Sequence, residues 1–235
     1  MQAIILAGGF GTRLQPVVPH VPKPMAPVGD EPFLVSLLRY MHTQGVREVV
    51  FALHHQAWMI RDYFGERFAG MDIQYSIEGT PLGTGGAIKR ALPMLRRHTP
   101  TFVANGDSLV MLNYREMLSR HNASGAPITL ASVLMPVTHR YSRLTSEGGR
   151  ITRYELLGDG NPGAISAGFY VVNPDIFVPH ALPEVFSIER DFLAVHTPTL
   201  RPAMFEHVEY FIDIGIPVDY QRAQLEVHHR LRRAA

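Results

Sequence analysis

Apolar and polar residues follow two different spacings along the first half of this 235-residue chain. Mostly apolar runs, typical of buried strands, occupy residues 2–7, 48–53 and 101–104, and residues 72–77 alternate as a half-buried strand does. Between them, apolar residues at 34, 37, 38 and 41 have the spacing of a helix over residues 33–44. Further helices are predicted over residues 58–68, from a capping Thr84 to about residue 96, and from Asn113, in a capping box with Glu116, to about residue 121. This order predicts an α/β fold, Rossmann-like, with a mostly parallel central sheet and helices on both faces.

The pattern changes after residue 126, where strands follow one another with few helices between them. Strands are predicted over residues 128–134, 143–146, 150–156 and 164–172, with a hairpin at Gly148-Gly149. A short helix is expected within residues 186–195, a last strand over 209–212, and a closing helix from Pro217 to about residue 232. We therefore expect one domain over residues 1–235, in which a half with a small antiparallel extension (127–235) follows the α/β half (1–126).

Composition and charge narrow the class of protein. The chain is 46% hydrophobic and 18% charged, as in ordinary water-soluble globular proteins. Its net charge of +1 gives no overall field that would attract nucleic acid or a membrane, and Arg230, Arg232 and Arg233 suit the end of the closing helix. The chain has no cysteine, no signal-peptide pattern and no apolar segment long enough to span a membrane. We therefore expect a cytoplasmic protein that binds neither nucleic acid nor membranes.

A glycine-rich loop follows the first predicted strand. It has the sequence GGFGTRL over residues 8–14, and Lys23-Pro24 follows after a proline-rich stretch. Glycines let backbone N–H groups approach a ligand, and successive N–H groups in such a turn form a concave anion site. Arg13 adds a planar cation and Lys23 a compact one, which suits a nucleoside triphosphate better than a plain surface turn. The spacing excludes a Walker A loop, and the third glycine of a dinucleotide fingerprint is missing, which disfavours a hydride-transfer enzyme.

Three predicted loops lie at the carboxyl ends of strands, where open α/β sheets bind ligands. They are residues 8–13, 78–84 and 105–107, and we expect them to converge on one crevice. Asp107 ends the third loop, and Asp213 follows another apolar strand far along the chain. Carboxylates placed in this way could hold Mg²⁺, which takes one or two protein carboxylates together with phosphate oxygens. For either residue alone, the alternative is a turn or capping role.

These motifs together resemble the sugar-1-phosphate nucleotidyltransferase family. The shared patterns are L-A-G-G-x-G-T-R-L…K-P over residues 6–24, N-G-D over 105–107, and D-x-G-T-P over 213–217, where Ile216 replaces the usual threonine. The resemblance covers residues 6–220 and implies the nucleotide-diphospho-sugar transferase fold. It implies catalytic roles for Arg13, Lys23 and Asp107, with Asp107 and Asp213 as Mg²⁺ ligands. The nucleotide-binding residues that it implies are Leu6, Gly8, Gly9, Gly11, Thr12, Arg13, Glu78, Gly83 and Thr84.

The loop EGTPLGTGGA at residues 78–87 resembles the family's nucleobase loop, and its glycines allow flat packing against a base. A carboxylate at Glu78 could accept from N1–H and N2–H₂ of guanine, which lie side by side. Uracil and thymine offer a single N3–H between two oxygens that would repel the carboxylate. A charge-assisted pair in a dry pocket is worth roughly 1.5–3 kcal/mol, so GTP is the favoured nucleotide. The alternative is that Glu78 points to solvent.

The sugar side departs from the family pattern. The family has a Glu-Lys pair in its second half, whereas here Leu156 follows Glu155. The missing lysine leaves the incoming phosphate short of a cation, and the sequence does not choose among four replacements: Arg140, Arg143, Arg153 and Arg190. Residues 166–170 and 187–191 resemble two further family segments, although Glu189 could equally cap a helix. The substrate-binding residues that the resemblance implies are Asn105, Glu155, Gly168, Glu189 and Arg190.

Histidine pairs and aromatic residues suggest other sites. His54-His55 and His228-His229 are adjacent in sequence, so the rings of each pair would face different directions and zinc binding is disfavoured. Trp58 and Phe64 have the spacing of core residues in a helix rather than of a stacking platform. No Ser/His/Asp or Cys/His nucleophile arrangement stands out.

Within the family, residues 81–87 and 211–220 look most like those of the bacterial heptose-1-phosphate guanylyltransferases. This resemblance implies transfer of GMP from GTP to a manno-heptose 1-phosphate, which yields pyrophosphate and a GDP-heptose for surface polysaccharide. The first alternative is a guanylyltransferase for mannose 1-phosphate, or a UTP- or dTTP-dependent transferase for a hexose 1-phosphate. The second is a non-catalytic nucleotide-binding regulator. The expected partners are GTP, a sugar 1-phosphate and Mg²⁺, and a homo-oligomer stays open.

Overall fold

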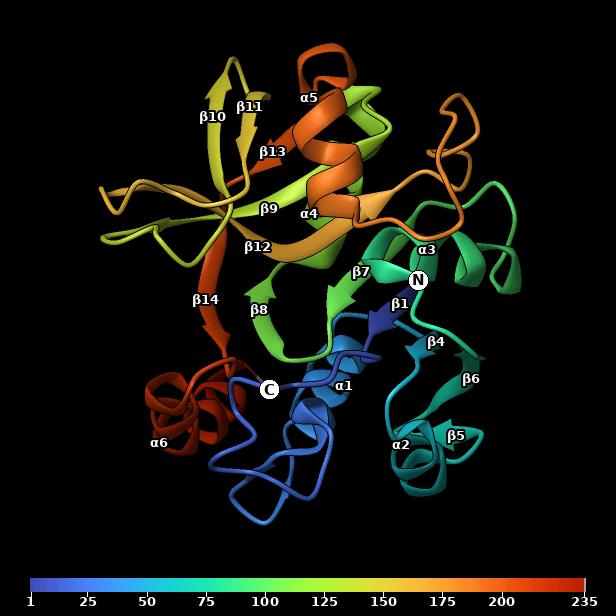
Figure 1. Cartoon of the computed structure of the whole chain (residues 1–235), viewed down its shortest axis with the longest axis vertical. Coiled ribbons are helices and arrows are strands. Elements are labelled where there is room, and N and C mark those ends of the chain that lie inside the picture. The colour runs from blue at the N-terminus through green and yellow to red at the C-terminus, as the bar shows by residue number, and fades with distance from the viewer. Residues whose placement is uncertain (235) are drawn as a thin grey trace.

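The first half of the chain forms four parallel strands toward one edge of a larger sheet (Figure 1). The computed structural model describes residues 1–234. The four strands are β1 (Gln2–Leu6), β4 (Glu48–Leu53), β6 (Met71–Ile77) and β7 (Thr101–Asn105). They pair side by side in the order β7-β1-β4-β6. Because they are parallel, their carboxyl ends lie at the same end of the sheet, and the loops that follow them meet there.

The second half extends this sheet with strands of both directions. Its strands are β9 (Ile128–Met135), β10 (Arg143–Glu147), β11 (Arg150–Glu155), β12 (Gly163–Val172) and β13 (Ala203–Phe205). β12 joins the halves because it pairs antiparallel with both β7 and β9. With β5 (Arg67–Phe68) beside β6, the ten strands have the order β10-β11-β13-β9-β12-β7-β1-β4-β6-β5. The α/β prediction is confirmed, but the sheet as a whole is mixed rather than mostly parallel, since most second-half pairs are antiparallel.

Two short ribbons lie outside the large sheet. β8 (Ser108–Leu112) pairs antiparallel with β14 (Val208–Asp213), and β2 (Pro27–Val28) pairs with β3 (Glu31–Pro32). The sequence pattern predicts β14 but not β8, because the apolar run of β8 follows β7 after only two residues. β13 is also unpredicted, since three residues are too few to show a period.

Helices cover both faces of the sheet. They are α1 (Phe33–Thr43), α2 (Ala57–Phe64), α3 (Gly83–Ala91), α4 (Tyr114–Ser124), α5 (Ala194–Leu200) and α6 (Pro217–Ala234), with 3-10 turns at Lys23–Met25 and Leu92–Met94 and a π-helix at Ile188–Leu193. Neighbouring residues of β1 enter different cores: Ile5 packs with α1, α2, α4 and α6, and Ile4 packs with α3 and the π-helix. Helices on both faces are therefore confirmed. Among the described residues, no helix has the length and apolar character needed to cross a membrane.

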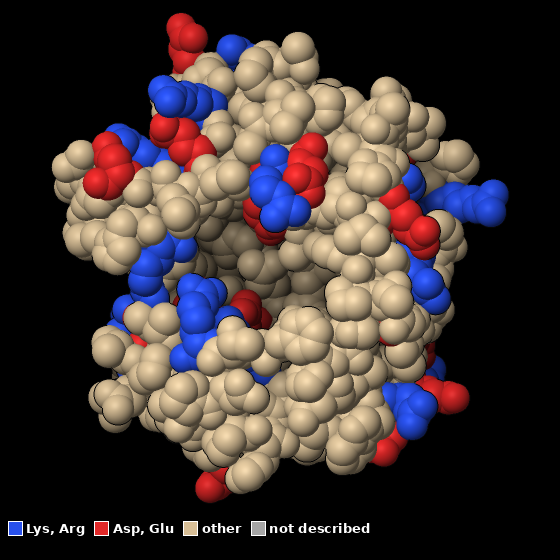
Figure 2. Space-filling model, viewed as in Figure 1, with Lys and Arg blue, Asp and Glu red and all other residues tan. Residues whose placement is uncertain are grey.

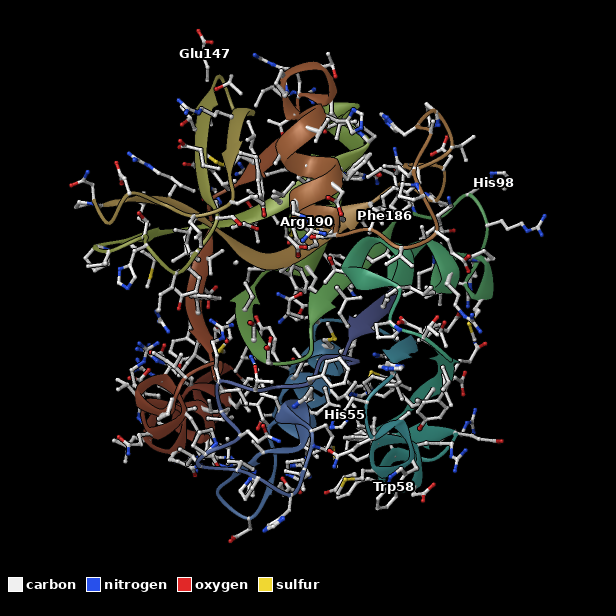
Figure 3. The ribbon with its side chains drawn as sticks, viewed as in Figure 1. His55, Trp58, His98, Glu147, Phe186 and Arg190 are labelled. Atoms are coloured by element: carbon white, nitrogen blue, oxygen red, sulfur yellow. The ribbon has the colours of Figure 1, made fainter. Side chains whose placement is uncertain are left out.

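The second helix is shorter than its pattern predicts. α2 ends at Phe64 rather than at residue 68, because Gly65 takes a φ of 58° and breaks the helical path. Phe64 is buried as predicted, but Trp58 is 59% exposed and lies at the outside of the molecule (Figure 3). The core interpretation is therefore wrong for Trp58, because α2 buries only one side and Trp58 lies on the other.

Helix capping also differs between the two predicted sites. Asn113 caps α4 as predicted, since its side chain accepts a bond of 3.0 Å from Glu116 N. Thr84 does not cap α3, whose capping residue is Leu82. α3 ends at Ala91, earlier than the predicted residue 96, because Pro93 follows in a 3-10 turn and cannot donate a helical bond.

Candidate active site

A cavity of about 420 Å³ opens where the parallel strands end, and Figure 2 shows it as a hollow in the face of the molecule. We call this cavity the cleft. Its lining includes the loop of residues 8–13, residues of the loop 78–84, and Asn105 and Asp107 after β7. The structure thus brings the three predicted loops together. Acidic atoms lie inside the hollow, and basic side chains gather at one side of its mouth (Figure 2).

The glycines of the first loop have different structural roles. A Cβ on Gly8 would lie 2.9 Å from the backbone N of His54, so the packing of the loop against the end of β4 requires glycine there. Gly11 has a φ of +64°, and a Cβ there would lie 3.1 Å from the Cβ of Lys23. Gly9 has no heavy atom within 4 Å of an added Cβ. Gly9 therefore leaves the room that a phosphate group needs, whereas Gly8 and Gly11 shape the loop.

Both cations of the first loop region reach the cleft. Leu6, Thr12 and Arg13 line it, with Thr12 and Arg13 exposed. Lys23 begins a 3-10 turn, and its side chain, only 10% exposed, forms an ion pair with Asp107. The Nζ atom of Lys23 also lies 4.0 Å from an oxygen of Asp213. One buried ammonium thus stands between two carboxylates.

The β8–β14 ribbon explains why two aspartates so distant in sequence meet. Gly106 and Asp107 turn the chain from β7 into β8, and Asp213 ends β14 opposite Ser108. The backbone N of Ile214 donates to the carbonyl of Asp107 at 3.0 Å, which fixes the two turns against each other. An oxygen of Asp213 accepts from Gly215 N at 2.7 Å, so its carboxylate has a defined direction.

The electrostatics of this group show a shortage of positive charge. Burial, together with the charge of Asp107, raises the pKa of Asp213 to about 6, while Lys23 and Arg13 oppose the rise. Two carboxylates facing one lysine therefore have room for a further cation. The residues fit Mg²⁺, which prefers oxygen ligands and commonly takes one or two protein carboxylates. Residues 1–234 contain no group of three or more His, Cys, Asp or Glu side chains placed to hold a metal, so the other ligands of such an ion would come from substrate phosphates and water.

Glu78 points inward rather than to solvent. The residue is 8% exposed, lines the cleft and accepts a bond of 2.9 Å from Leu82 N through its Oε2 atom. Burial raises the pKa of Glu78 above its ordinary value, and the bond from Leu82 opposes that rise. The solvent alternative is therefore wrong. One carboxylate oxygen is fixed by the loop, and the other is left to meet a ligand.

Most glycines of the second loop pack against protein. A Cβ on Gly83 or on Gly86 would lie 2.5 Å from a carbonyl oxygen of residues 184–186, and one on Gly85 would overlap the ring of Phe186. Gly85 N also donates to Phe186 O at 2.9 Å. An added Cβ on each of these three glycines would therefore meet the segment 184–186, which packs against α3 (Figure 3). Gly83 also lines the cleft, and flat packing of the loop against a base stays a prediction. Gly79 alone among the loop's glycines meets open space.

Thr84 holds a carboxylate instead of capping its helix. Its Oγ1 donates to Oε2 of Glu189 at 2.6 Å and accepts from Ile188 N at 3.0 Å. Ser187 Oγ donates to the same Glu189 oxygen at 2.7 Å. Ser187, not Glu189, caps the π-helix, because Arg190 N donates to its hydroxyl. Glu189 therefore lines the cleft with one of its carboxylate oxygens fixed by two hydroxyls.

The other predicted substrate residues divide into two groups. Asn105 lines the cleft, and Gly168, which is outside the lining, packs beside it. Gly168 has a φ of +68°, and an added Cβ would lie 2.3 Å from the amide nitrogen of Asn105, so the position requires glycine. Glu155 lies outside the lining and pairs with Arg153 at 3.0 Å. Arg190 is also outside the lining, and its guanidinium pairs with Asp191 at 2.9 Å (Figure 3). The structure thus does not bring Glu155 and Arg190 into the cleft.

His54 was missed as a residue of the site. It lines the cleft, and its Nδ1 lies 3.0 Å from the carbonyl of Glu78, so it ties the first two loops together. In the sequence, His54 stands out only as part of the pair His54-His55, for which zinc binding is disfavoured. Its position directly after β4 is the signal that could have placed it, because residues at the carboxyl ends of parallel strands face the ligand.

Comparisons with known proteins agree with this geometry. The chain is 41% identical to a D-glycero-alpha-D-manno-heptose 1-phosphate guanylyltransferase of Aneurinibacillus thermoaerophilus, over 97% of this chain and 99% of that one. It is 39% identical to the protein of the same name in Campylobacter jejuni, over 94% and 97% of the two chains. Both relatives thus match almost from end to end.

Solved structures give the same picture. HddC from Yersinia pseudotuberculosis superposes with a TM-score of 0.84 and 32% identity, over 96% of this chain and 98% of that one. The structure of HddC complexed with GMP-PN superposes with a TM-score of 0.82 and 31% identity, with the same coverage. The family model described as nucleotidyl transferase matches residues 2–228. This chain therefore belongs to the nucleotidyl transferase family.

Proposed function

We propose that this enzyme transfers GMP from GTP to a manno-heptose 1-phosphate and releases pyrophosphate. The observation that carries the proposal is that Lys23 and Asp107 line the cleft together with the loop of residues 8–13, while Asp213, which is outside the lining, lies 4.0 Å from the Nζ atom of Lys23. The names of the two end-to-end relatives support the heptose 1-phosphate and the guanylyl group. We assign the nucleotide to residues 1–126 and the sugar mainly to residues 127–235 of one domain.

The reaction needs positioning more than proton transfer. A phosphate monoester is largely a dianion at neutral pH, because its second pKa is about 6, so its oxygen attacks the α-phosphorus without a general base. The new P–O bond forms as the bond to the β-phosphate oxygen breaks and pyrophosphate leaves with those electrons. Arg13 binds the triphosphate and the departing pyrophosphate, and Lys23 stabilises charge at the α-phosphate. Asp107 and Asp213 would hold Mg²⁺, which when bound neutralises charge on the phosphates.

In this proposal, the loop of residues 78–84 recognises the base. Guanine N1–H and N2–H₂ meet the carboxylate of Glu78, which lines the cleft. Asn105 and Glu189 also line the cleft, and in this proposal they bind sugar hydroxyls. The product would be a GDP-heptose, made from cytoplasmic GTP and used for bacterial surface polysaccharide.

A pyrophosphate-release screen tests the proposal. GTP, ATP, UTP and dTTP are each combined with D-glycero-α-D-manno-heptose 1-phosphate, mannose 1-phosphate and glucose 1-phosphate in the presence of MgCl₂. We expect the highest kcat/KM for GTP with the heptose 1-phosphate. Preference for UTP or dTTP would contradict the role of Glu78, and absence of pyrophosphate from every pair would favour a nucleotide-binding regulator.

Two aspartate variants test the metal assignment. Asp107→Asn and Asp213→Asn should each lower kcat by about 100- to 1,000-fold, in line with the loss of a group that stabilises transition-state charge. Asp62→Asn on α2 is the matched control, because its carboxylate is 60% exposed and outside the cleft. Near-normal turnover of both cleft variants in Mg²⁺ would overturn the assignment.

A further inference from the structure

The reaction brings two phosphate-bearing substrates together, and the described cleft has cations for only one of them. Arg13 and Lys23 both come from the loop region that binds the triphosphate. The sugar phosphate approaches from the other half and carries two negative charges of its own. Position 156, where the family has a lysine, holds a leucine that is 41% exposed. A basic side chain of the second half that lies near Asp213 could therefore bind the sugar phosphate beside Mg²⁺.

Three of the four candidate arginines are committed elsewhere. Arg143 pairs with Asp159 at 2.7 Å, Arg153 with Glu155 at 3.0 Å, and Arg190 with Asp191 at 2.9 Å. None of the four arginines is in the lining of the cleft, and these three carboxylates lie on segments other than β14 and the start of α6, between which Asp213 is found. The three arginines are therefore occupied away from the place where the phosphates meet.

Arg140 is held by residues on either side of Asp213. It lies in the loop between β9 and β10, and its Nη2 donates to Asp219 at 2.6 Å and to the Tyr141 hydroxyl at 2.9 Å. The Tyr141 ring packs edge-on against Phe211 with 5.8 Å between ring centroids. Phe211 precedes Asp213 in β14, and Asp219 follows it in the first turn of α6. These contacts hold a second-half arginine against the two segments that flank Asp213 in the sequence.

The guanidinium of Arg140 keeps most of its donors for a ligand. An arginine has five N–H donors, and Nη2 carries two of them. Within residues 1–234, neither Nε nor Nη1 of Arg140 has a hydrogen-bond partner, and the side chain is 27% exposed. Burial lowers the pKa of Arg140, but the bond to Asp219 and the charges of Tyr141, Asp219 and Asp213 raise it above its ordinary value. The group is therefore charged, oriented and open on one side.

We propose that Arg140 binds the phosphate of the sugar 1-phosphate and that Asp219 is its positioning residue. This inference rests on the proposed transfer to a sugar 1-phosphate. Asp219 is 7% exposed and also accepts from Arg222 at 3.3 Å, so a second contact besides Arg140 fixes its position. A planar guanidinium with free N–H groups matches two phosphate oxygens at once, which the leucine at position 156 cannot do.

Steady-state kinetics of Arg140→Gln test the proposal. The KM for D-glycero-α-D-manno-heptose 1-phosphate should rise about 10- to 100-fold, the range expected for loss of a charge-assisted contact, while the KM for GTP stays within about threefold. Arg140→Lys should recover part of the loss, because it restores the charge but not the fork. Asp219→Asn should raise the same KM by a smaller factor. The matched control is Arg143→Gln, whose side chain is 29% exposed and also forms an ion pair, and it should leave both KM values unchanged.

The outcomes distinguish a failure of the Arg140 inference from a failure of the proposed function. If the wild-type enzyme releases pyrophosphate but Arg140→Gln and Arg143→Gln have the same KM for the sugar phosphate, Arg140 is not its ligand and only this inference falls. Equal rises in both KM values would also overturn it, because they indicate a structural role. If thermal unfolding shows that Arg140→Gln is not folded, the folded variant Arg140→Lys provides the test. An unchanged KM for the sugar phosphate in Arg140→Lys would contradict recognition of the phosphate by the planar guanidinium. A wild-type enzyme that releases no pyrophosphate overturns the proposed function instead.

Discussion

The Thr84→Val substitution tests whether α3 contacts the nucleotide or positions a carboxylate for the sugar. Valine has nearly the shape of threonine but no hydroxyl, so the variant loses the donor to Glu189 at 2.6 Å and the acceptor for Ile188 N at 3.0 Å. A hydrogen bond to a charged group is worth about 1.5–3 kcal/mol, which corresponds to a factor of roughly 10 to 100. Ser187 still donates to the same Glu189 oxygen at 2.7 Å, so we expect the lower end of that range.

The assay follows pyrophosphate release while each substrate is varied in turn. In Thr84→Val, kcat/KM for the heptose 1-phosphate should fall about tenfold, with the KM for GTP within twofold of wild type. Thr84→Ser keeps the hydroxyl and should restore activity. Thr80→Val is the control, because Thr80 is exposed in the same loop and outside the lining of the cleft. A rise in the KM for GTP with unchanged sugar kinetics would refute this reasoning and return Thr84 to the nucleotide site.

Three further predictions concern the cleft and the core. Lys23→Ala should lower kcat by about 100-fold with little change in GTP affinity measured by calorimetry, because Lys23 acts on developing charge; the reverse result would make it a binding residue. Glu78→Gln should reduce the preference of kcat/KM for GTP over UTP by about tenfold, and an unchanged ratio would remove Glu78 from base recognition. Burial lowers the pKa of His121, whose two ring nitrogens form hydrogen bonds with the side chains of Thr129 and Asn173. The free energy of unfolding should therefore fall as the pH drops below about 6.5, where only the unfolded chain gains the proton, and urea unfolding of His121→Gln should show less of this loss.

The sequence predicts the parallel strands and their loops well, because each has a local cause. β1, β4 and β7 are apolar runs of buried type, and the residues that follow them must lie at one end of the sheet. Asp107 and Lys23 could be placed for this reason together with the family motifs.

Residues whose positions depend on distant packing could not be predicted. Thr84 has the sequence context of a helix cap, but the segment that supplies Ile188 and Glu189 covers α3 from far along the chain. Glu155 matches a family position, yet its strand places it beside Arg153 and away from the cleft. The exposure of Trp58 likewise depends on which side of α2 meets the sheet, and an isolated helical spacing does not settle that.

The β8–β14 ribbon also has a consequence for how the enzyme comes into being. The parallel strands β7, β1, β4 and β6 can pair before the last fifth of the polypeptide leaves the ribosome, because all four precede residue 106. Asp213 reaches its place beside Asp107 and Lys23 only when β14 pairs with β8. A nascent chain can therefore form its nucleotide-binding loops early and still lack catalytic activity. With the role that we propose for Asp213, activity begins only after this late, long-range strand pairing.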